Sequence, residues 1–252
     1  MITVESTHAK WDIQPLRRKR AEEIRDLLHS NGMHHVSRQL EGRTDDTSMD
    51  QSTLYAASKR LFDLLAAVTL ILIALPVAIL VALSIYIDDG GPIFFAQDRI
   101  GQHGRRFRFL KFRSMVRDAD RAKGELLQVN EASGPIFKMK HDPRVTRVGR
   151  FIRRYSLDEL PQLLSVITGD MAMIGPRPLV FGEAAQCDNR QWRRHNVKPG
   201  VMCLREVCGR SRLSFSQWME LDLIYLDTRS IKTDVCVLLR ACTAVLTSDG
   251  AY

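Results

Sequence analysis

An adjacent pair of carboxylates, Asp158 and Glu159, is the first feature of this sequence that could do chemistry. Ser156 comes just before the pair, and a serine followed three residues later by a glutamate is a pattern that caps the start of a helix. A dense run of cations lies upstream of the pair: Lys138, Lys140, Arg144, Arg147, Arg150, Arg153 and Arg154. Such cations suit phosphate groups, and an aspartate that stays ionised among them could attack phosphorus or bind Mg²⁺. Capping and catalysis both remain open roles for the pair.

Other familiar signals of chemistry are weak or missing in the sequence. Gly101-Gln102-His103-Gly104 does not have the glycine spacing of a dinucleotide-binding turn, and there is no phosphate-binding loop of the Gly-Lys-Ser/Thr kind. The five cysteines form no Cys-x-x-Cys pair, which indicates reduced thiols of a cytosolic protein rather than disulfides or a zinc site. His141 and His195 are expected to be polar residues of the surface or the core.

The elements that must position the pair include a long apolar segment. From Leu64 to Ile87 no residue is charged, and leucine, isoleucine, valine and alanine predominate. At about 1.5 Å per residue, a straight helix of this length would cross a bilayer core of about 30 Å. A helix buried in a soluble core usually has a shorter apolar run, so we expect association with a membrane.

Two features favour a helix that enters and leaves the membrane on the same side. Pro76 lies at the middle of the apolar run, where it removes a backbone hydrogen bond and should break or kink the helix. Basic residues occur at both flanks: Lys59 and Arg60 before the run, and Arg99, Arg105, Arg106, Arg108, Lys111 and Arg113 after it. Cytoplasmic flanks of membrane segments are enriched in lysine and arginine, so a re-entrant helix–break–helix satisfies both flanks. Asp63 has the helical spacing to pair with Arg60 near the lipid head groups.

The whole chain then divides into three parts. Residues 1–51 are expected to form a polar, flexible extension, residues 52–90 a membrane-inserted re-entrant hairpin, and residues 91–252 a catalytic domain on the cytosolic face. We predict a mixed α/β fold that is mainly helical.

Three local patterns organise the last part. Residues 107–113 alternate apolar and basic side chains as a half-buried strand does, and residues 156–168 have helical spacing. Gly175-Pro176-Arg177-Pro178 must form a stiff loop. Residues 215–226 and 231–246 have the pattern of amphipathic helices at the membrane interface. In the first of them, Trp218 and Tyr225 are placed either as interfacial anchors or as core residues.

The composition of the 252 residues is that of a globular protein, with 45% hydrophobic and 26% charged residues. A mean hydropathy of −0.16 excludes a protein with several membrane spans. The net charge of +8 calls for an anionic partner, which could be nucleic acid, a membrane surface or a phosphorylated substrate. A nucleic-acid partner is not expected, because the sequence has no known binding motif and no basic–aromatic stacking platform.

Ordered motifs from about Ser58 to Tyr252 match those of one enzyme family. They are Lys59-Arg60-x-x-Asp63, Gly91-Pro92-Ile93-Phe94-Phe95, Lys111-Phe112-Arg113-Ser114-Met115, Asp142-Pro143-Arg144, Ser156-Leu157-Asp158-Glu159-Leu160-Pro161-Gln162, Gly169-Asp170-Met171, Gly175-Pro176-Arg177-Pro178 and Lys198-Pro199-Gly200. The sequence therefore resembles the monotopic bacterial phosphoglycosyl transferases, also called bacterial sugar transferases.

The resemblance implies an activity and its participants. Members transfer a sugar-1-phosphate from a UDP-sugar to undecaprenyl phosphate or another polyprenyl phosphate and release UMP, which initiates surface or exopolysaccharide assembly. The family's Asp-Glu pair matches Asp158 and Glu159, with the aspartate as nucleophile of a phosphosugar-enzyme intermediate and Mg²⁺ held nearby. Further residues are implied in substrate binding: Arg153, Arg177, Pro176, Pro178, Lys111, Arg113 and Arg210. Membrane lipids at the cytoplasmic face of the bacterial inner membrane are further partners, and a homo-oligomer is left open.

The sequence departs from the family at two places. Leu75 precedes Pro76 where the family often has serine, and Arg205 and Glu206 are charged where aromatic and amide side chains are common. The second departure leaves an alternative function open, a non-catalytic scaffold or regulator that is tethered to the membrane and has the same fold.

Overall fold

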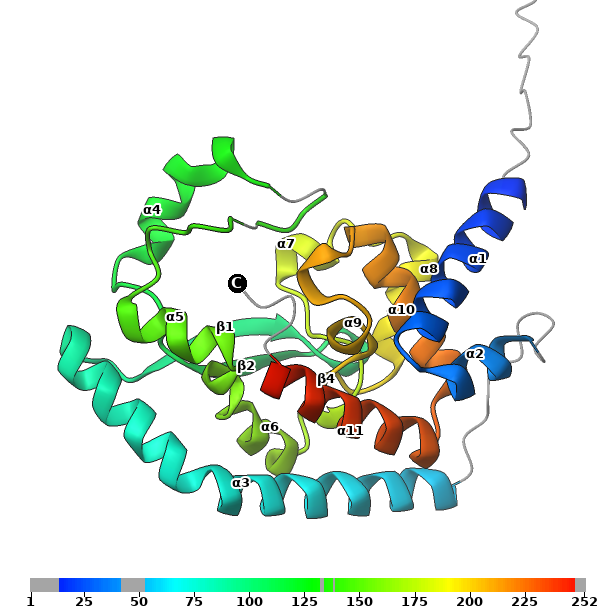
Figure 1. Ribbon diagram of the computed structural model, residues 1–252, viewed down its shortest axis with the longest axis horizontal. Helices are drawn as coiled ribbons and strands as arrows, with labels where there is room; N and C mark the ends of the chain where they lie inside the picture. Colours follow the sequence, from blue (N-terminus) through cyan, green and yellow to red (C-terminus); the bar gives the residue numbers. More distant parts are fainter. Residues whose placement is uncertain (1–13, 42–52, 132–133, 138, 248–252) are drawn as a thin grey trace, which may run out of the picture.

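The computed structural model describes residues 14–41, 53–131, 134–137 and 139–247. These residues form mainly helices with two small pairs of strands, so the predicted fold class is confirmed (Figure 1). Lys138 of the predicted cation run and residues 1–13 and 42–51 of the predicted extension lie outside the described residues.

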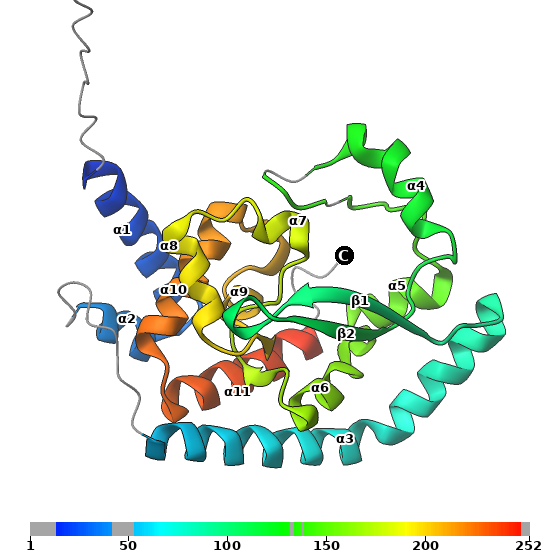
Figure 2. The same ribbon diagram turned by 180° about the vertical axis from the view of Figure 1, so that it is seen from behind.

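The longest element is α3 (Thr53–Asp89), which contains the apolar segment found in the sequence. It is one continuous helix with Pro76 inside it, and its ribbon bends partway along its length (Figures 1 and 2). A proline removes one backbone hydrogen bond and crowds the preceding turn, which bends a helix without ending it. The break that we expected at Pro76 is therefore a bend in this structure.

Much of α3 turns its apolar side chains away from the rest of the protein. Leu72, Ile73, Leu80 and Ile87 are exposed, and 11% of the most apolar stretch of the helix is buried. Among the described residues, α3 is the one helix that is long and apolar enough to cross a membrane. Apolar surface of this extent is unfavourable in water, so α3 supports association with a membrane.

The polar start of α3 contacts the protein core in a way that the sequence did not predict. Asp63 is 3% exposed, pairs with Lys59 at 2.6 Å and accepts the Met173 backbone N–H at 3.0 Å. Arg60 instead donates to the carbonyl oxygens of Val166 and Ile167 at 2.7 and 3.0 Å. The predicted Arg60–Asp63 pair at the lipid head groups is therefore wrong, because Asp63 points into the core.

The two strand pairs lie above α3. β1 (Phe94–Ile100) and β2 (Arg106–Phe112) form an antiparallel hairpin, which confirms the predicted strand, and the hairpin extends from the distal end of α3 toward the opposite side of the molecule (Figure 2). β3 (Ala172–Ile174) and β4 (Gly200–Met202) are parallel. A Cβ atom on Gly200 would lie 2.1 Å from the Gly175 nitrogen, so this close backbone approach requires glycine.

Short helical elements connect these parts. They are α4 (Ala119–Leu126), η2 (Leu127–Val129), α5 (Arg147–Arg154), η3 (Leu157–Glu159), α6 (Gln162–Thr168), α7 (Phe181–Ala184), α8 (Asn189–Trp192), η4 (Arg193–Asn196), α9 (Leu204–Val207) and η5 (Arg210–Arg212), with η1 (Gln102–Gly104) joining β1 to β2.

The two predicted C-terminal helices are present as α10 (Phe215–Thr228) and α11 (Ile231–Thr247). Trp218 and Tyr225 are each 4% exposed, and the Tyr225 hydroxyl donates within the core. Of the two roles left open for these residues, core packing is therefore the one observed. On α11, Val235 and Leu239 are 37% and 63% exposed, together with the charged side chains of Lys232 and Arg240.

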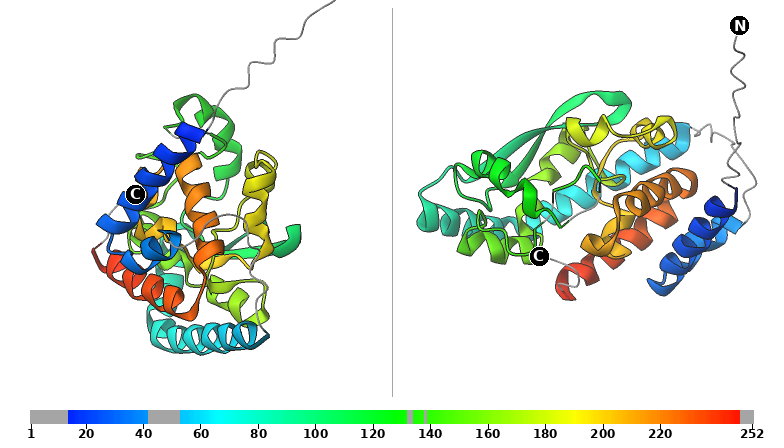
Figure 3. Two further views of the ribbon diagram at one scale, coloured as in Figure 1. Left: turned by 90° about the vertical axis from the view of Figure 1, so that its right-hand side faces the viewer. Right: turned by 90° about the horizontal axis from the view of Figure 1, so that it is seen from above.

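Two helices form from the segment expected to be a flexible extension. They are α1 (Gln14–Ser30) and α2 (His34–Glu41), which lie beside α10 and α11 (Figure 3). Ile24, Leu28, Met33 and Val36 are almost fully buried in the main core. The prediction of a flexible extension is therefore wrong for residues 14–41, because its polar composition conceals one apolar stripe that packs.

Candidate active site

The chain turns sharply just before the carboxylate pair. Ser156 follows α5 in the left-handed conformation, with φ of 55°. Asp158 and Glu159 then lie in the short 3₁₀ turn η3, and the α-helix α6 begins later, at Gln162. The predicted capping box at Ser156 is therefore wrong, because the residues that should start the helix form a separate turn.

Lys111 brings the hairpin to this turn. Its Nζ atom lies 2.9 Å from Glu159 Oε1 and 3.4 Å from Asp158 Oδ2. Lys111 is on β2, opposite Phe95 of β1. The strand pairing therefore sets the position along the hairpin at which its ammonium contacts the two carboxylates. Both carboxylates are thus paired with one cation from a distant segment of the chain.

Arg177 reaches Glu159 from the other side. Its Nη2 atom lies 2.7 Å from Glu159 Oε1, and its Nη1 atom lies 3.1 Å from Glu206 Oε1 on α9. One guanidinium therefore bridges two carboxylates that are far apart in the sequence. Arg177 shares this partly buried network with Lys111, and both were predicted as substrate-binding residues.

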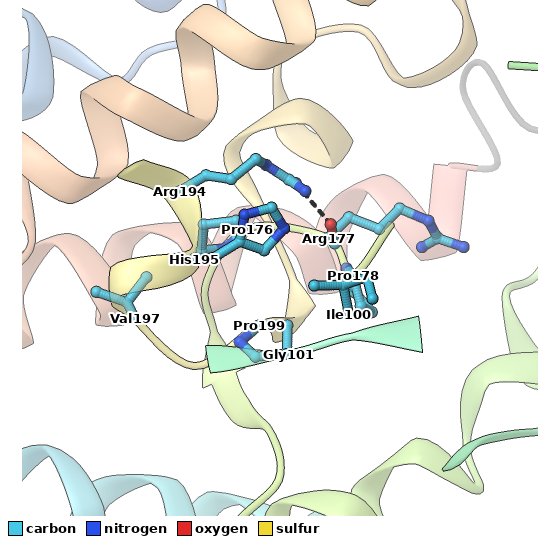
Figure 4. A pocket seen from close by; sticks show the side chains of 9 residues that line it. All are labelled: Ile100, Gly101, Pro176, Arg177, Pro178, Arg194, His195, Val197 and Pro199. Carbon is cyan, nitrogen blue, oxygen red and sulfur yellow. Dashed lines mark hydrogen bonds between the residues drawn. The ribbon is translucent and has the colours of Figure 1, made fainter. Parts of the chain in front are cut away.

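A second layer of contacts holds the loop that carries Arg177. Arg194 donates to the Arg177 carbonyl oxygen at 2.6 Å, and it is itself paired with buried Asp222 through Nε at 2.9 Å. In Figure 4 the Arg177 side chain points away from Arg194 and His195, whereas its backbone faces them. Pro176 and Pro178 flank Arg177 and line a pocket of about 10 Å³, so they stiffen the loop as predicted.

The pKa values of the two carboxyl groups are shifted in opposite directions. Burial raises the pKa of Asp158, Lys111 lowers it again in part, and the negative charge of Glu159 adds to the rise. Burial acts in the same direction on Glu159, but Arg177 and Lys111 outweigh it and hold the pKa of this carboxyl well below its usual range. The surrounding cations therefore favour the ionised form of Asp158 as expected, but burial and Glu159 outweigh them in the direction of its pKa, because the cations contact Glu159 more closely.

A cavity of about 420 Å³ opens beside Asp158. Its walls come from the β1–β2 hairpin, the segment after β2, and α5. Five cations line it: Arg99, Lys111, Arg113, Arg117 and Arg153. Apolar side chains, including Phe94, Phe95 and Phe112, line it as well. The cavity therefore combines a carboxylate, five cationic side chains and apolar surface.

Some of the remaining predicted residues line this cavity, and others lie elsewhere in the structure. Arg153 lines the cavity with Asp158, and Arg113 lines it while pairing with Asp89 at 2.9 Å. Arg210 is not among the described residues that line the cavity, and it begins η5 with φ of 47°. Arg144 pairs with Asp142 at 2.7 Å and so has a structural contact instead of a free charge.

Comparison with known proteins identifies the protein family to which the chain belongs. The family described as "Bacterial sugar transferase" matches residues 54–248. The chain belongs to the bacterial sugar transferase family. It is therefore a transferase, and the resemblance inferred from its motifs is confirmed.

Individual relatives show how far the similarity extends. The chain is 41% identical over 195 residues to the galactosyl transferase CpsE of Streptococcus agalactiae serotype III (strain NEM316), covering 77% of this chain and 43% of CpsE. It is 39% identical over 203 residues to the undecaprenyl-phosphate galactose phosphotransferase of Salmonella typhimurium (strain LT2), covering 77% of this chain and 41% of that protein. It is 37% identical over 199 residues to the exopolysaccharide production protein ExoY of Sinorhizobium fredii (strain NBRC 101917 / NGR234), covering 77% of this chain and 88% of ExoY. The match thus spans less than half of the first two relatives and most of the third.

Two residues of this sugar transferase site were not predicted as site residues. Arg99 lines the cavity and donates to the Pro178 carbonyl oxygen at 3.1 Å, and Glu206 holds Arg177. The alternation of β1 could have identified Arg99, because it shares a strand face with Phe95, which is opposite Lys111. Glu206 was noticed as a departure from the family, but its contact with Arg177 depends on the tertiary fold.

The donor set of the site can be compared with the needs of Mg²⁺. Asp158 and Glu159 offer two carboxylates, and the described residues contain no group of three histidine, cysteine or acidic side chains that could hold a metal. Mg²⁺ is usually held by one or two protein carboxylates together with substrate phosphates and water. The two carboxylates therefore fit a Mg²⁺ ion that is held partly by a phosphorylated substrate.

Proposed function

We propose that this sugar transferase moves a sugar-1-phosphate from a UDP-sugar to undecaprenyl phosphate or a similar polyprenyl phosphate and releases UMP. The observation that carries the proposal is the position of Asp158, at the wall of a cation-lined cavity beside the Lys111–Glu159–Arg177 network. The names of the relatives support the same class of reaction, since the Salmonella protein is an undecaprenyl-phosphate galactose phosphotransferase. The product would initiate surface or exopolysaccharide assembly, and ExoY is named for exopolysaccharide production.

Asp158 is the proposed nucleophile. A carboxylate oxygen attacks the phosphorus that bears the sugar, and the bond from this phosphorus to the bridging oxygen breaks, so that UMP leaves with the electron pair. A phosphate oxygen of the polyprenyl phosphate then attacks the same phosphorus, and the bond to Asp158 breaks. The carboxylate is regenerated, and atoms and charges balance over the two steps.

The other residues of the site provide charge and position. Lys111 and Arg153 face the cavity beside Asp158 and would disperse the charge that grows on the phosphoryl oxygens. Glu159 stays ionised because of Arg177 and Lys111, so it can hold Mg²⁺ together with Asp158. A Mg²⁺ ion bound there would neutralise phosphoryl oxygens and favour the ionised form of Asp158.

The placement of α3 supports a re-entrant membrane segment on the cytoplasmic face. Lys59 near its start pairs with Asp234 of α11 at 3.1 Å, and Asp89 at its end pairs with Arg113. Both ends of the helix therefore contact one body, which lies on a single side of α3 (Figure 1). A straight crossing would separate the two ends by a bilayer core of about 30 Å, which these contacts oppose.

Substitution of the nucleophile tests the proposed reaction. In Asp158→Asn the amide cannot form the phosphosugar intermediate, so we expect transfer of labelled sugar phosphate into organic-extractable lipid to fall by at least about 10³-fold. The matched control is Asp98→Asn, an exposed aspartate of β1, which should keep near-normal activity. Full activity of Asp158→Asn would exclude the nucleophile assignment, and no UMP release from any UDP-sugar by the unaltered protein would exclude the function.

A further inference from the structure

We propose that the cavity binds its two phosphate-bearing substrates at opposite ends of one hairpin face, with Asp158 between them. The lipid phosphate acceptor would bind at the Arg113 end, and the pyrophosphate of the donor at the Arg99–Arg177 end. This inference rests on the proposed function and adds a position for each substrate.

The register of the hairpin gives the order of the cations. Phe95 is opposite Lys111, and Arg99 is opposite Phe107, so Arg99 and Lys111 lie on the same face of the two strands. Arg113 follows Lys111 by two residues and continues that face beyond the strand end. At about 3.3 Å per residue, Arg113 and Arg99 project on either side of Lys111, roughly 7 and 13 Å away along the strands. Lys111 contacts Asp158, so the nucleophile lies between the two outer cations.

The Arg113 end has a donor that is prepared for an anion. Arg113 is 7% exposed, and its Nη2 atom is held by Asp89 at 2.9 Å. Its Nη1 atom is buried and has no hydrogen-bond partner within the described part of the chain. A buried unpaired N–H is unfavourable, so an anion that reaches this atom would gain a strong charge-assisted hydrogen bond. Arg117 lies at the same end and donates to the Gly90 carbonyl oxygen at 3.1 Å.

The same end is also apolar and exposed. Phe94 and Phe95 line the cavity and are 48% and 38% exposed, and Pro92 and Val116 join them there. The end of α3 lies next to this region, where Ile87 is 82% exposed. Exposed aromatic rings beside a guanidinium suit an amphiphile with a phosphate head and an isoprenoid chain. A membrane-borne acceptor would therefore enter from the α3 side.

The opposite end offers cations from two different elements. Arg99 is on β1, lines the cavity and donates to the Pro178 carbonyl oxygen in the loop of Arg177. Arg177 lines the small neighbouring pocket and reaches Glu159 from that loop. The Arg99 Nε atom is buried and has no hydrogen-bond partner among the described residues. Two guanidinium groups near each other match the two phosphates of a nucleotide diphosphate. This end therefore suits the water-soluble donor.

Separate kinetics for the two substrates test this arrangement. We expect Arg113→Gln to raise KM for undecaprenyl phosphate about tenfold or more, with a clearly smaller effect on KM for the UDP-sugar. Arg99→Gln should show the reverse order. The amount of UMP released in a single turnover without acceptor reports on folding and on the donor step in each variant. An Arg113→Gln variant whose KM for the UDP-sugar rises as much as that for the acceptor would overturn the inference.

Two further measurements separate the phosphate site from the lipid site. Inorganic phosphate probes the anion position alone, and it should compete with undecaprenyl phosphate in the unaltered protein and in Phe95→Ser but not in Arg113→Gln. Phe95→Ser should still raise KM for undecaprenyl phosphate, since it removes apolar contact only. Unchanged acceptor KM in both variants would overturn the inference even if the enzyme is active. Absence of UMP release by the unaltered protein would instead contradict the proposed function.

Discussion

At the scale of residues, the site is defined by which carboxylate the cations contact. Lys111 and Arg177 both contact Glu159, whereas Asp158 is paired, within the described part of the chain, with Lys111 alone and at a longer distance. Glu159 is therefore held as a permanent anion, while burial makes Asp158 a weaker acid. A nucleophile with a raised pKa is more basic and thus more reactive toward phosphorus once it is ionised.

Glu206 gives a prediction about pH. Burial and the nearby charge of Glu159 raise the pKa of Glu206, so it protonates at a higher pH than an ordinary glutamate does. As the pH falls through this pKa, Arg177 Nη1 loses a charged partner and becomes available to the donor phosphates. We therefore expect KM for the UDP-sugar to decrease about tenfold as the pH falls in the unaltered protein, because one charge-assisted hydrogen bond contributes about 1.5 kcal/mol.

The variant Glu206→Gln should lose that pH dependence. Its amide keeps the shape of the side chain but carries no charge, so KM should stay low across the range. Glu220→Gln is the matched control, because Glu220 pairs with Arg190 on the surface, 2.7 Å away. Steady-state kinetics between pH 5 and 8 measure the effect, and the same KM profile in the protein and the variant would show that Glu206 does not control Arg177.

At the scale of elements, α3 is joined to the catalytic body through polar contacts at its start. Asp63 satisfies the Met173 N–H of β3, and Asp234 of α11 accepts from Tyr225 at 2.9 Å while facing Lys59. Arg60 satisfies carbonyl groups at the end of α6, where a helix leaves its last acceptors unpaired. The segment after β3 carries Arg177, so these contacts link the membrane helix to the site.

Removal of the Asp63 carboxylate should be strongly destabilising. Asp63→Ala leaves the buried Met173 N–H without its acceptor and removes one of the two carboxylates that pair with the Lys59 ammonium. We expect the free energy of unfolding to fall by about 3 kcal/mol. Thermal or denaturant unfolding in detergent measures the change, with Asp118→Ala, an exposed aspartate, as the control that should change it by less than about 0.5 kcal/mol. A similar small effect for both variants would contradict the role of Asp63.

At the scale of the whole molecule, one body contacts both ends of α3 and includes the helices that precede the family match. The core contains residues of α1 and α2 together with β3, α9, α10 and α11. The family match begins at residue 54, so α1 and α2 lie outside the part of the chain that it covers. They complete the core on the side of α10 and α11.

The helices α1 and α2 should therefore contribute to global stability. Leu28 is fully buried, and Leu28→Ala should lower the free energy of unfolding by about 2–5 kcal/mol because it leaves a cavity. Leu54→Ala is the comparison, since Leu54 is 78% exposed. Denaturant unfolding followed by circular dichroism distinguishes the two. If Leu28→Ala were as stable as Leu54→Ala, the packing of α1 would not matter to the fold.

The re-entrant arrangement predicts that both ends of α3 are accessible to reagents from the same side of the membrane. Ser58→Cys and Asp118→Cys, each made in a Cys242→Ser background, replace exposed residues near the start of α3 and beyond its end. Both should react with a membrane-impermeant thiol reagent from the cytoplasmic side only. Inverted and right-side-out vesicles provide the comparison, and reaction of the two positions from opposite sides would show that α3 crosses the membrane.

The sequence by itself determined the family, the carboxylate pair and the apolar helix. Motif order, local charge and an uninterrupted apolar run are properties of neighbouring residues, so they can be recognised without a fold. The same local rules failed at Ser156, where a left-handed residue replaces the expected helix cap, and at residues 14–41, where a polar segment packs into the core. Local preference is weak, and contacts from distant segments override it.

Only the tertiary structure decided which groups meet and which of them are ionised. Lys111, Asp158, Arg177 and Glu206 come from four separate elements, and their distances depend on how β2, η3, the loop after β3 and α9 pack. The structure likewise placed Asp63 in the core instead of beside Arg60. Electrostatic energies and pKa values depend on distance and burial, and neither quantity is fixed until the chain has folded.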